Sequence, residues 1–228
     1  MDPFTSIFAR GGVQASPAPG QRAVTNSLLD TRVSALLCAR LCHELIGPIA
    51  AINNGTELLA DDDLDFANDA VELIGVGAPQ AADRLQFYRF AYGLSGGGAA
   101  AGTQPRDLAA RLFGGSRITC EYGESTAVLP LEWQKLACNL LLVGADALPR
   151  GGRLVLATAI LEVEAIGEAP ALSPETLAAL TLVAPVHSLT SRTVQAYFAG
   201  ALAASLGCRL VGRAEPRRVR LAAVISAD

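Results

Sequence analysis

Residues 33–59 read VSALLCARLCHELIGPIAAINNGTELL, and this stretch decides the predicted fold. Its apolar residues recur at spacings of three, four and seven, which is typical of an amphipathic helix. They are Leu37, Leu41, Leu45, Ile49, Ile52 and Leu59. Asp30 or Thr31 is suited to cap the start of this helix. The pattern therefore predicts a helix from Leu28 to about Ala60, ended by the acidic turn at residues 61–63.

The middle of this helix carries one of only two histidines in the chain, His43. On a helical wheel His43 lies away from the apolar stripe. The residues that share its face are Leu36, Arg40, Gly47, Ala50 and Asn54. The small side chains of Gly47 and Ala50 allow the backbone of another protein to come close to the imidazole, and Arg40 is suited to offset the charge of a phosphate.

Phosphoryl transfer requires a neutral imidazole nitrogen in line with the phosphorus and positive charge around the transferred oxygens. Glu44, the next residue, is suited to hold the tautomer of His43 or to accept a proton. His43 is thus a candidate phosphoryl carrier, although spacing alone favours an ordinary exposed histidine. A zinc-protease motif is excluded, because the position four residues after His43 is Gly47. Cys38, Cys42 and His43 have no later Cys or His pair with ligand spacing, so buried apolar cysteines are the preferred interpretation.

A second helical pattern runs from about Asp65 to Tyr92. Gly75, Gly77 and Pro79 predict a kink or a break in its middle, and Pro48 predicts a kink in the first helix. Two helices joined by a short turn form an αα-hairpin that leaves much apolar surface exposed, and a second copy would complete a four-helix bundle. In a hairpin folded about the acidic turn, Arg84 lies level with His43 and is a second candidate for the phosphate.

Flexible segments surround the predicted hairpin, which we place at residues 29–95. Residues 1–28 are rich in Gly, Pro, Ser and Ala and predict a flexible tail, while SGGGAAAG at residues 95–102 predicts a linker. Residues 103–228 then mix helical and strand patterns, which indicates an α+β or α/β layered domain. The helices are predicted at 105–113, 130–148, 174–182 and 190–206, and the strands at 118–122, 154–160, 208–212 and 219–225.

Composition limits the classes of function. The formal net charge is −4, so there is no electrostatic reason to expect a nucleic-acid partner. Five cysteines without a repeating spacing argue against a disulfide framework. No run of 18 apolar residues lacks charges or turn residues, and no signal peptide is recognised, so we expect a cytoplasmic chain without a membrane partner.

The run His43-Glu44-Leu45-Ile46-Gly47-Pro48 resembles the H-box of sensor histidine kinases, in which a phospho-accepting histidine precedes an acid and, five residues on, a proline. The longer run LLCARLCHELIGPIAAINNGTELL resembles more closely the ChpT-type histidine phosphotransferases. RLQFYRFAYG at 84–93 and ALPRGG at 147–152 are further matches. The resemblance implies an α+β protein: a homodimeric four-helix bundle followed by a degenerate domain similar to the histidine-kinase ATPase, an α/β sandwich.

The nucleotide motifs expected of such a domain are degenerate at three places. The expected Mg²⁺ ligand on the first long helix falls on Val143, which offers no oxygen, although Asn139 has a counterpart. The segment 162–168 lacks the Asp and the second Gly of an adenine-binding motif, and 186–191 lacks phosphate-binding glycines. His187 is interpreted as a structural residue. We therefore expect no ATP and no cofactor of the chain's own.

The preferred hypothesis is a histidine phosphotransferase of a bacterial phosphorelay. His43 takes a phosphoryl group from a receiver aspartate, such as that of a hybrid histidine kinase, and passes it to response-regulator receiver domains that supply the Mg²⁺. Glu44, Arg40 and Arg84 assist, while Gly47, Ala50 and Asn54 contact the receiver. The alternatives are an atypical ATP-dependent histidine kinase and a non-catalytic dimeric adaptor for receivers.

Overall fold

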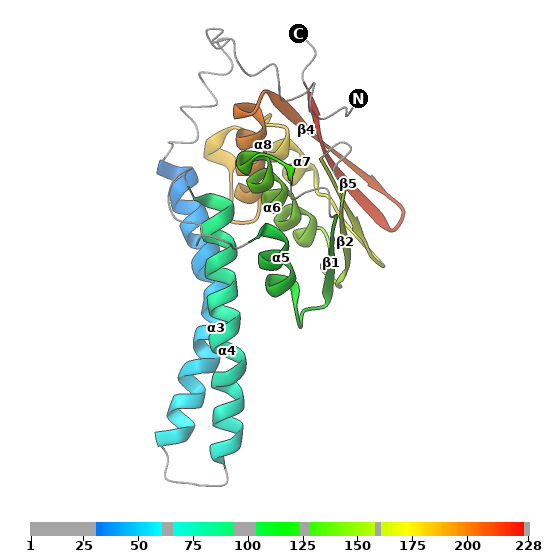
Figure 1. The fold of residues 1–228 in the computed structure, drawn as a ribbon. Helices are drawn as coiled ribbons and strands as arrows, with labels where there is room; N and C mark the ends of the chain where they lie inside the picture. The colour runs from blue at the N-terminus through cyan, green and yellow to red at the C-terminus, as the bar shows by residue number, and fades with distance from the viewer. Residues whose placement is uncertain (1–30, 61–65, 94–103, 124–127, 158–160, 226–228) are drawn as a thin grey trace.

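The computed structural model describes residues 31–60, 66–93, 104–123, 128–157 and 161–225. The predicted tail at 1–28 and the predicted linker at 95–102 lie outside the described residues. Two long helices, α3 (Thr31–Ala60) and α4 (Ala67–Tyr92), lie side by side and extend well beyond the rest of the molecule (Figure 1).

The predicted break in the second helix is wrong, because α4 continues from Ala67 through Pro79 to Tyr92. The glycines serve a different purpose. A Cβ on Gly77 would lie 2.7 Å from the carbonyl oxygen of Pro48, and a Cβ on Gly55 would lie 2.7 Å from that of Ala70. Each helix thus has a glycine where a backbone carbonyl of the other helix approaches it.

The second part of the chain is a layer of helices on one five-stranded sheet. The strands are β1 (Ile118–Tyr122), β2 (Gly152–Ala157), β3 (Glu162–Ile166), β4 (Cys208–Glu215) and β5 (Arg218–Ile225). Their order is β1-β2-β3-β5-β4, with β1 and β2 parallel and the other neighbours antiparallel. The predicted α+β class is confirmed, and the stretch 154–166, in which no clear turn separates the two expected strands, contains the end of β2 and the central strand β3.

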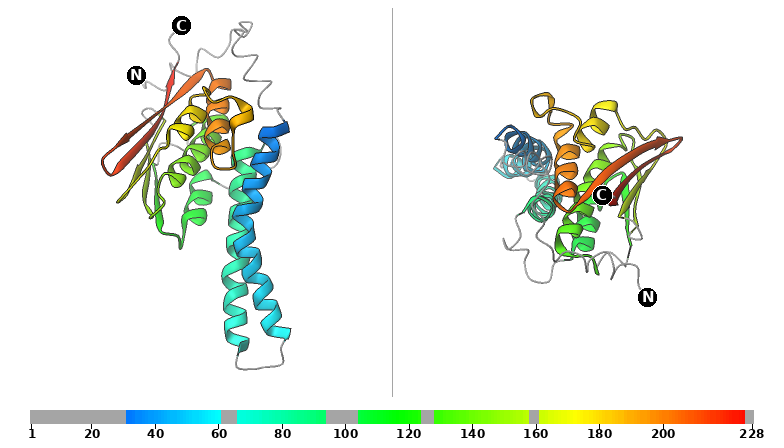
Figure 2. Two further views of the ribbon diagram at one scale, coloured as in Figure 1. Left: turned by 180° about the vertical axis from the view of Figure 1, so that it is seen from behind. Right: turned by 90° about the horizontal axis from the view of Figure 1, so that it is seen from above.

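The helices of this layer are α5 (Pro105–Phe113), α6 (Leu131–Asp146), α7 (Pro174–Leu180) and α8 (Val194–Ser205), with a short 3₁₀ turn, η3, at Val186–Ser188. They separate the sheet from the upper half of the hairpin, as the view from above shows (Figure 2). α6 is the central element: its residues 135–144 are all buried, between the sheet and the helices around it. The core therefore lies around α6, and the lower half of the hairpin has no neighbour among the described residues of this chain.

The hairpin carries most of the exposed large apolar side chains of the described residues. They number twelve, of which eight belong to the hairpin: Ile46, Ile49, Leu59, Phe66, Val71, Leu73, Val76 and Leu85. One helix, α3, also has the length and composition of a membrane span, with a mean hydropathy of 1.5 over 18 residues of which 11% are buried. We expected no such segment from the sequence, and α3 differs from that expectation. Core helices of proteins that never enter a membrane also have this length and hydropathy.

Candidate functional site

His43 lies in the middle of α3 and is exposed. Gly47, Ala50 and Asn54, which follow it on the same face, are exposed as well. No atom lies within 4 Å of the position that a Cβ on Gly47 would occupy. The structure therefore brings His43 and its three predicted contact residues together on one open surface of α3.

Arg84 lies close to the level of His43 on the neighbouring helix. Gly55 packs against Ala70 and Ile74, and Gly77 packs against Pro48 and Ile52. Continuing this antiparallel register up the hairpin places residues 82–86 opposite His43.

The charge of Arg84 is not compensated by another side chain of the described residues. Its guanidinium donates to the carbonyl of Gln80 in its own helix at 3.5 Å and makes no other hydrogen bond or ion pair within the described ranges. The charge is therefore available to an anion bound level with His43.

Arg40 has a partner that spacing did not reveal. Although it was predicted to lie beside a phosphate on His43, its Nη2 donates to Oδ1 of Asp146 at 2.8 Å. Asp146 is the last residue of α6, so this ion pair joins α3 to the second domain. Arg40 is only 9% exposed, and its charge is compensated by the carboxylate. Because Arg40 is buried and paired with Asp146, Arg84 is the stronger candidate for the residue that offsets the charge of a phosphate on His43.

Several polar groups surround this ion pair. Burial raises the pKa of Tyr88 above its usual value, and the carboxylates of Glu44 and Asp146 raise it further, while the Arg40 guanidinium opposes them. The pKa of Asp146 is also raised, first by desolvation, with Arg40 opposing and Glu44 adding to the rise. Burial lowers the pKa of Arg40, but Asp146 outweighs this effect and raises it. Glu44 therefore lies close enough to influence the pKa values of Tyr88 and Asp146.

A buried amide network holds α4 against the second domain, and sequence reasoning missed it. Asn139 of α6 donates to the carbonyl of Ala91 at 2.9 Å, and Gln195 of α8 donates to Oδ1 of Asn139 at 2.9 Å. The hydroxyl of Tyr92 donates to Oε1 of Gln195. Asn139 and Gln195 are both fully buried. The available signal was an amide within an otherwise apolar run of each helix, because such groups require hydrogen-bond partners when buried.

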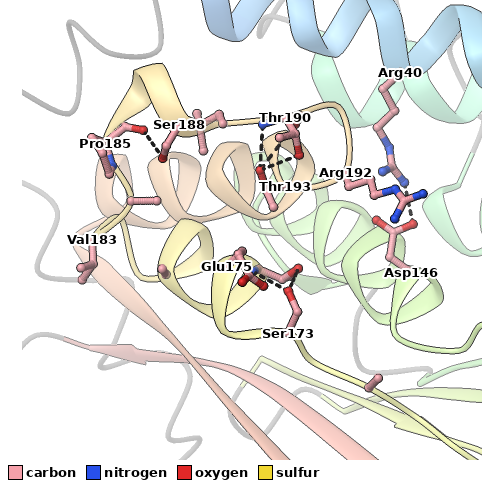
Figure 3. A pocket seen from close by; sticks show the side chains of 15 residues that line it. Arg40, Asp146, Ser173, Glu175, Val183, Pro185, Ser188, Thr190, Arg192 and Thr193 are labelled. Atoms are coloured by element: carbon pink, nitrogen blue, oxygen red, sulfur yellow. Dashed lines mark hydrogen bonds and ion pairs between the residues drawn. The ribbon is translucent and has the colours of Figure 1, made fainter.

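A large cavity of about 980 Å³ lies at the edge of the second domain. Residues of α3, α6, α7, η3 and the segment just before α8 line it, and Figure 3 shows this lining. Arg192 reaches toward the Arg40–Asp146 pair at one side of it (Figure 3). Hydroxyl groups line much of the rest, but Ser173 caps α7 and Ser188 donates to the carbonyl of Pro185.

The residues of this domain do not fit Mg·ATP. Val143 is 1% exposed within the core, so it offers neither an oxygen nor access to a cation. Asn139 already uses its amide in the network with Ala91 and Gln195. Residues 162–166 belong to the central strand β3, and the segment that follows it, 167–173, has one glycine and no aspartate. The positions that would hold the metal and the adenine are therefore occupied by residues of the core and of the sheet.

The remaining candidates stay separate from His43. His187 is exposed in η3. No group of three potential metal-ligating His, Cys, Asp or Glu side chains occurs in the part of the chain that the structure describes. Cys38 and Cys42 are exposed, which differs from the buried cysteines expected there.

Comparison with known proteins gives consistent results. Residues 103–218 match the model of the family described as histidine phosphotransferase C-terminal domain. The chain is 34% identical over 200 residues to the protein phosphotransferase ChpT of Brucella abortus (strain 2308), covering 82% of this chain and 91% of that protein. A solved structure of a bacterial phosphotransferase is 33% identical, with a TM-score of 0.67 over 84% of this chain and 95% of that chain.

The similarity thus extends over both the hairpin and the second domain. The matches also include 91% of the Brucella abortus protein and 95% of the solved structure, so the chain corresponds to nearly the whole of each. The chain belongs to the histidine phosphotransferase family and is a protein phosphotransferase.

Proposed function

We propose that His43 is the phosphoryl carrier of this phosphotransferase, taking the group from a receiver aspartate and passing it to the aspartate of another receiver domain. The observation that carries the proposal is the open surface of α3, where His43 is exposed and followed by Gly47, Ala50 and Asn54. A receiver must bring its own acidic site within bonding distance of the imidazole, and small exposed residues after the histidine permit that approach.

In the proposed reaction the P–O bond to the receiver aspartate breaks while a P–N bond to His43 forms. Glu44 holds the other ring nitrogen through its N–H, which keeps the attacking nitrogen neutral. Arg84 supplies positive charge to the transferred oxygens from the neighbouring helix. The receiver brings the Mg²⁺, so the chain requires no cofactor of its own.

We further propose that two copies associate through their hairpins. The support is the concentration of exposed apolar side chains there, which a second pair of helices would bury as the core of a four-helix bundle. Ile49 is exposed on a side of α3 away from His43, so that dimerisation through this side leaves the histidine accessible. A soluble, cytoplasmic dimer explains the apolar surface of α3 without a membrane.

The deciding experiment mixes the full-length chain with a phosphorylated receiver domain and locates the label. We expect acid-labile phosphate on the wild type and none on His43→Ala, with an unchanged circular dichroism spectrum because His43 is exposed. His187→Ala is the matched control and should accept phosphate normally. Label on the His43→Ala variant would refute the assignment of the carrier, and receiver binding without label on either protein would favour the adaptor alternative.

A further inference from the structure

Two oppositely charged residues flank His43 on the same side of α3. Arg40 and Glu44 are four residues apart, a spacing at which side chains on a helix come close enough to pair. Glu44 is also the residue that the proposed function assigns to hold the His43 imidazole. An Arg40–Glu44 ion pair would therefore occupy the carboxylate that the histidine needs.

The structure shows that this pair does not form. The Arg40 guanidinium binds Asp146 at 2.8 Å, and Figure 3 shows it reaching from α3 to the end of α6. Within the described ranges Glu44 makes no hydrogen bond and no ion pair. The Nε of Arg40 is buried and likewise has no hydrogen-bond partner there, so the guanidinium is oriented by Asp146 and not by the residues of its own helix.

Glu44 nevertheless lies near this ion pair without taking part in it. The charge of Glu44 contributes to the raised pKa of Asp146, and both carboxylates act on Tyr88, which lies beside Arg40. Arg40 is 9% exposed, and a buried guanidinium without a carboxylate is strongly unfavourable. If Asp146 lost its charge, Glu44, four residues further along the same helix, would be at a spacing that permits an ion pair with Arg40.

We propose that Asp146 is a positioning residue for phosphotransfer: by holding Arg40 on the second domain, it leaves the Glu44 carboxylate free to orient His43. This inference rests on the proposed role of His43. It gives the second domain a chemical part in the reaction, because the residue that controls the acid beside the histidine lies at the end of α6. Neither Arg40 nor Asp146 touches the transferred group.

The test measures phosphoryl transfer from a phosphorylated receiver to the full-length chain at saturating receiver, together with receiver affinity. Asp146→Asn should slow transfer about 100-fold, the lower end of the range for a lost proton-handling side chain, with little change in affinity. Glu44→Gln should show a similar loss. In the Glu44→Gln background, Asp146→Asn should add little, because the carboxylate that Arg40 would occupy is already absent.

The decisive variant is the double substitution Arg40→Gln with Asp146→Asn. It removes the cation that would pair with Glu44. The two amides that replace the charged groups are able to hydrogen-bond each other between α3 and the end of α6. Transfer should recover to within a few-fold of the wild type. A purely structural role for the ion pair gives the opposite result, because losing both charged groups would leave transfer as slow as in Asp146→Asn or slower.

Glu168→Gln is the matched control, since it breaks the exposed ion pair of Glu168 with Arg150 in the same domain and should leave transfer unchanged. The Asp146 side chain is 39% exposed, so its variant is expected to fold, and Asp146→Ser tests the same point if the Asn variant does not. Failure of the double variant to recover, or a wild-type rate in Asp146→Asn, overturns the proposal. Absence of label on His43 in the wild type would instead overturn the proposed function.

Discussion

Replacing Gly77 with alanine should destabilise the protein, although alanine is the better helix former. The added Cβ would lie 2.7 Å from the carbonyl oxygen of Pro48, 3.0 Å from Cγ1 of Ile52 and 3.2 Å from Cβ of Ala51. Overpacking of this kind costs about 1–3 kcal/mol. Helix propensity returns about 1 kcal/mol. Because one of the close atoms is backbone and cannot rotate away, we expect a net loss of about 1–2 kcal/mol.

Gly75 provides the matched control on the same helix. A Cβ there would meet no atom within 4 Å. Gly75→Ala should therefore keep the propensity gain and stabilise the protein by about 0.5–1 kcal/mol. The difference between the two variants isolates the contact between the helices, since the chemical change is identical and the positions are two residues apart.

Thermal unfolding at one protein concentration measures this difference. For a chain of this size, about 1 kcal/mol corresponds to a shift of roughly 2–4 °C, so the two midpoints should differ by about 3–12 °C. Gly47→Ala, at a second open position on α3, should behave like Gly75→Ala. If Gly77→Ala and Gly75→Ala raise the midpoint equally, the helices do not approach each other at Gly77, and the register that places Arg84 level with His43 loses its support.

Three further predictions concern partner binding, association and nucleotide. Gly47→Leu should slow transfer from a phosphorylated receiver about 100-fold, because a displacement of about 1 Å at the reacting atoms has an effect of that size; an unchanged rate would show that the receiver docks elsewhere. Ile49→Asp should convert a dimer into a monomer in light scattering at micromolar concentration, because it places a charge on the apolar side of α3, whereas a monomeric wild type would contradict the dimer outright. Isothermal titration with Mg·ATP should show no binding tighter than about 100 μM, since each missing contact to phosphate or metal is worth roughly 1.5–3 kcal/mol; tighter binding would revive the kinase alternative.

Much of the architecture was predictable from local patterns. The helix at 105–113 and the strand at 118–122 match their predicted bounds, because turn residues and apolar periodicity mark their ends. The exposure of His43 was also predictable, since the face of a side chain follows from its position in a helix of known period. The resemblance to the histidine phosphotransferases was confirmed by the comparisons.

Local patterns were misleading where a residue's role depends on a distant neighbour. Gly77 and Pro79 in isolation indicate a break, yet α4 continues through both. The need for a glycine at position 77 arises instead from the approach of the Pro48 carbonyl. The bounds of β3 could not be read from the sequence, because no clear turn separates it from β2, and its central place depends on pairing with β5, more than fifty residues later in the chain.

The sequence by itself determined the helix that carries His43, the small residues beside it and the loss of the nucleotide motifs, because all of these depend on residue type and helical period. Only the tertiary structure decided the partner of Arg40. Spacing within α3 favours Glu44, four residues away, whereas folding brings Asp146 to it from 106 residues further along the chain. A buried guanidinium pairs with the carboxylate that packing places against it. Contacts between distant segments cannot be inferred from the periodicity of either helix.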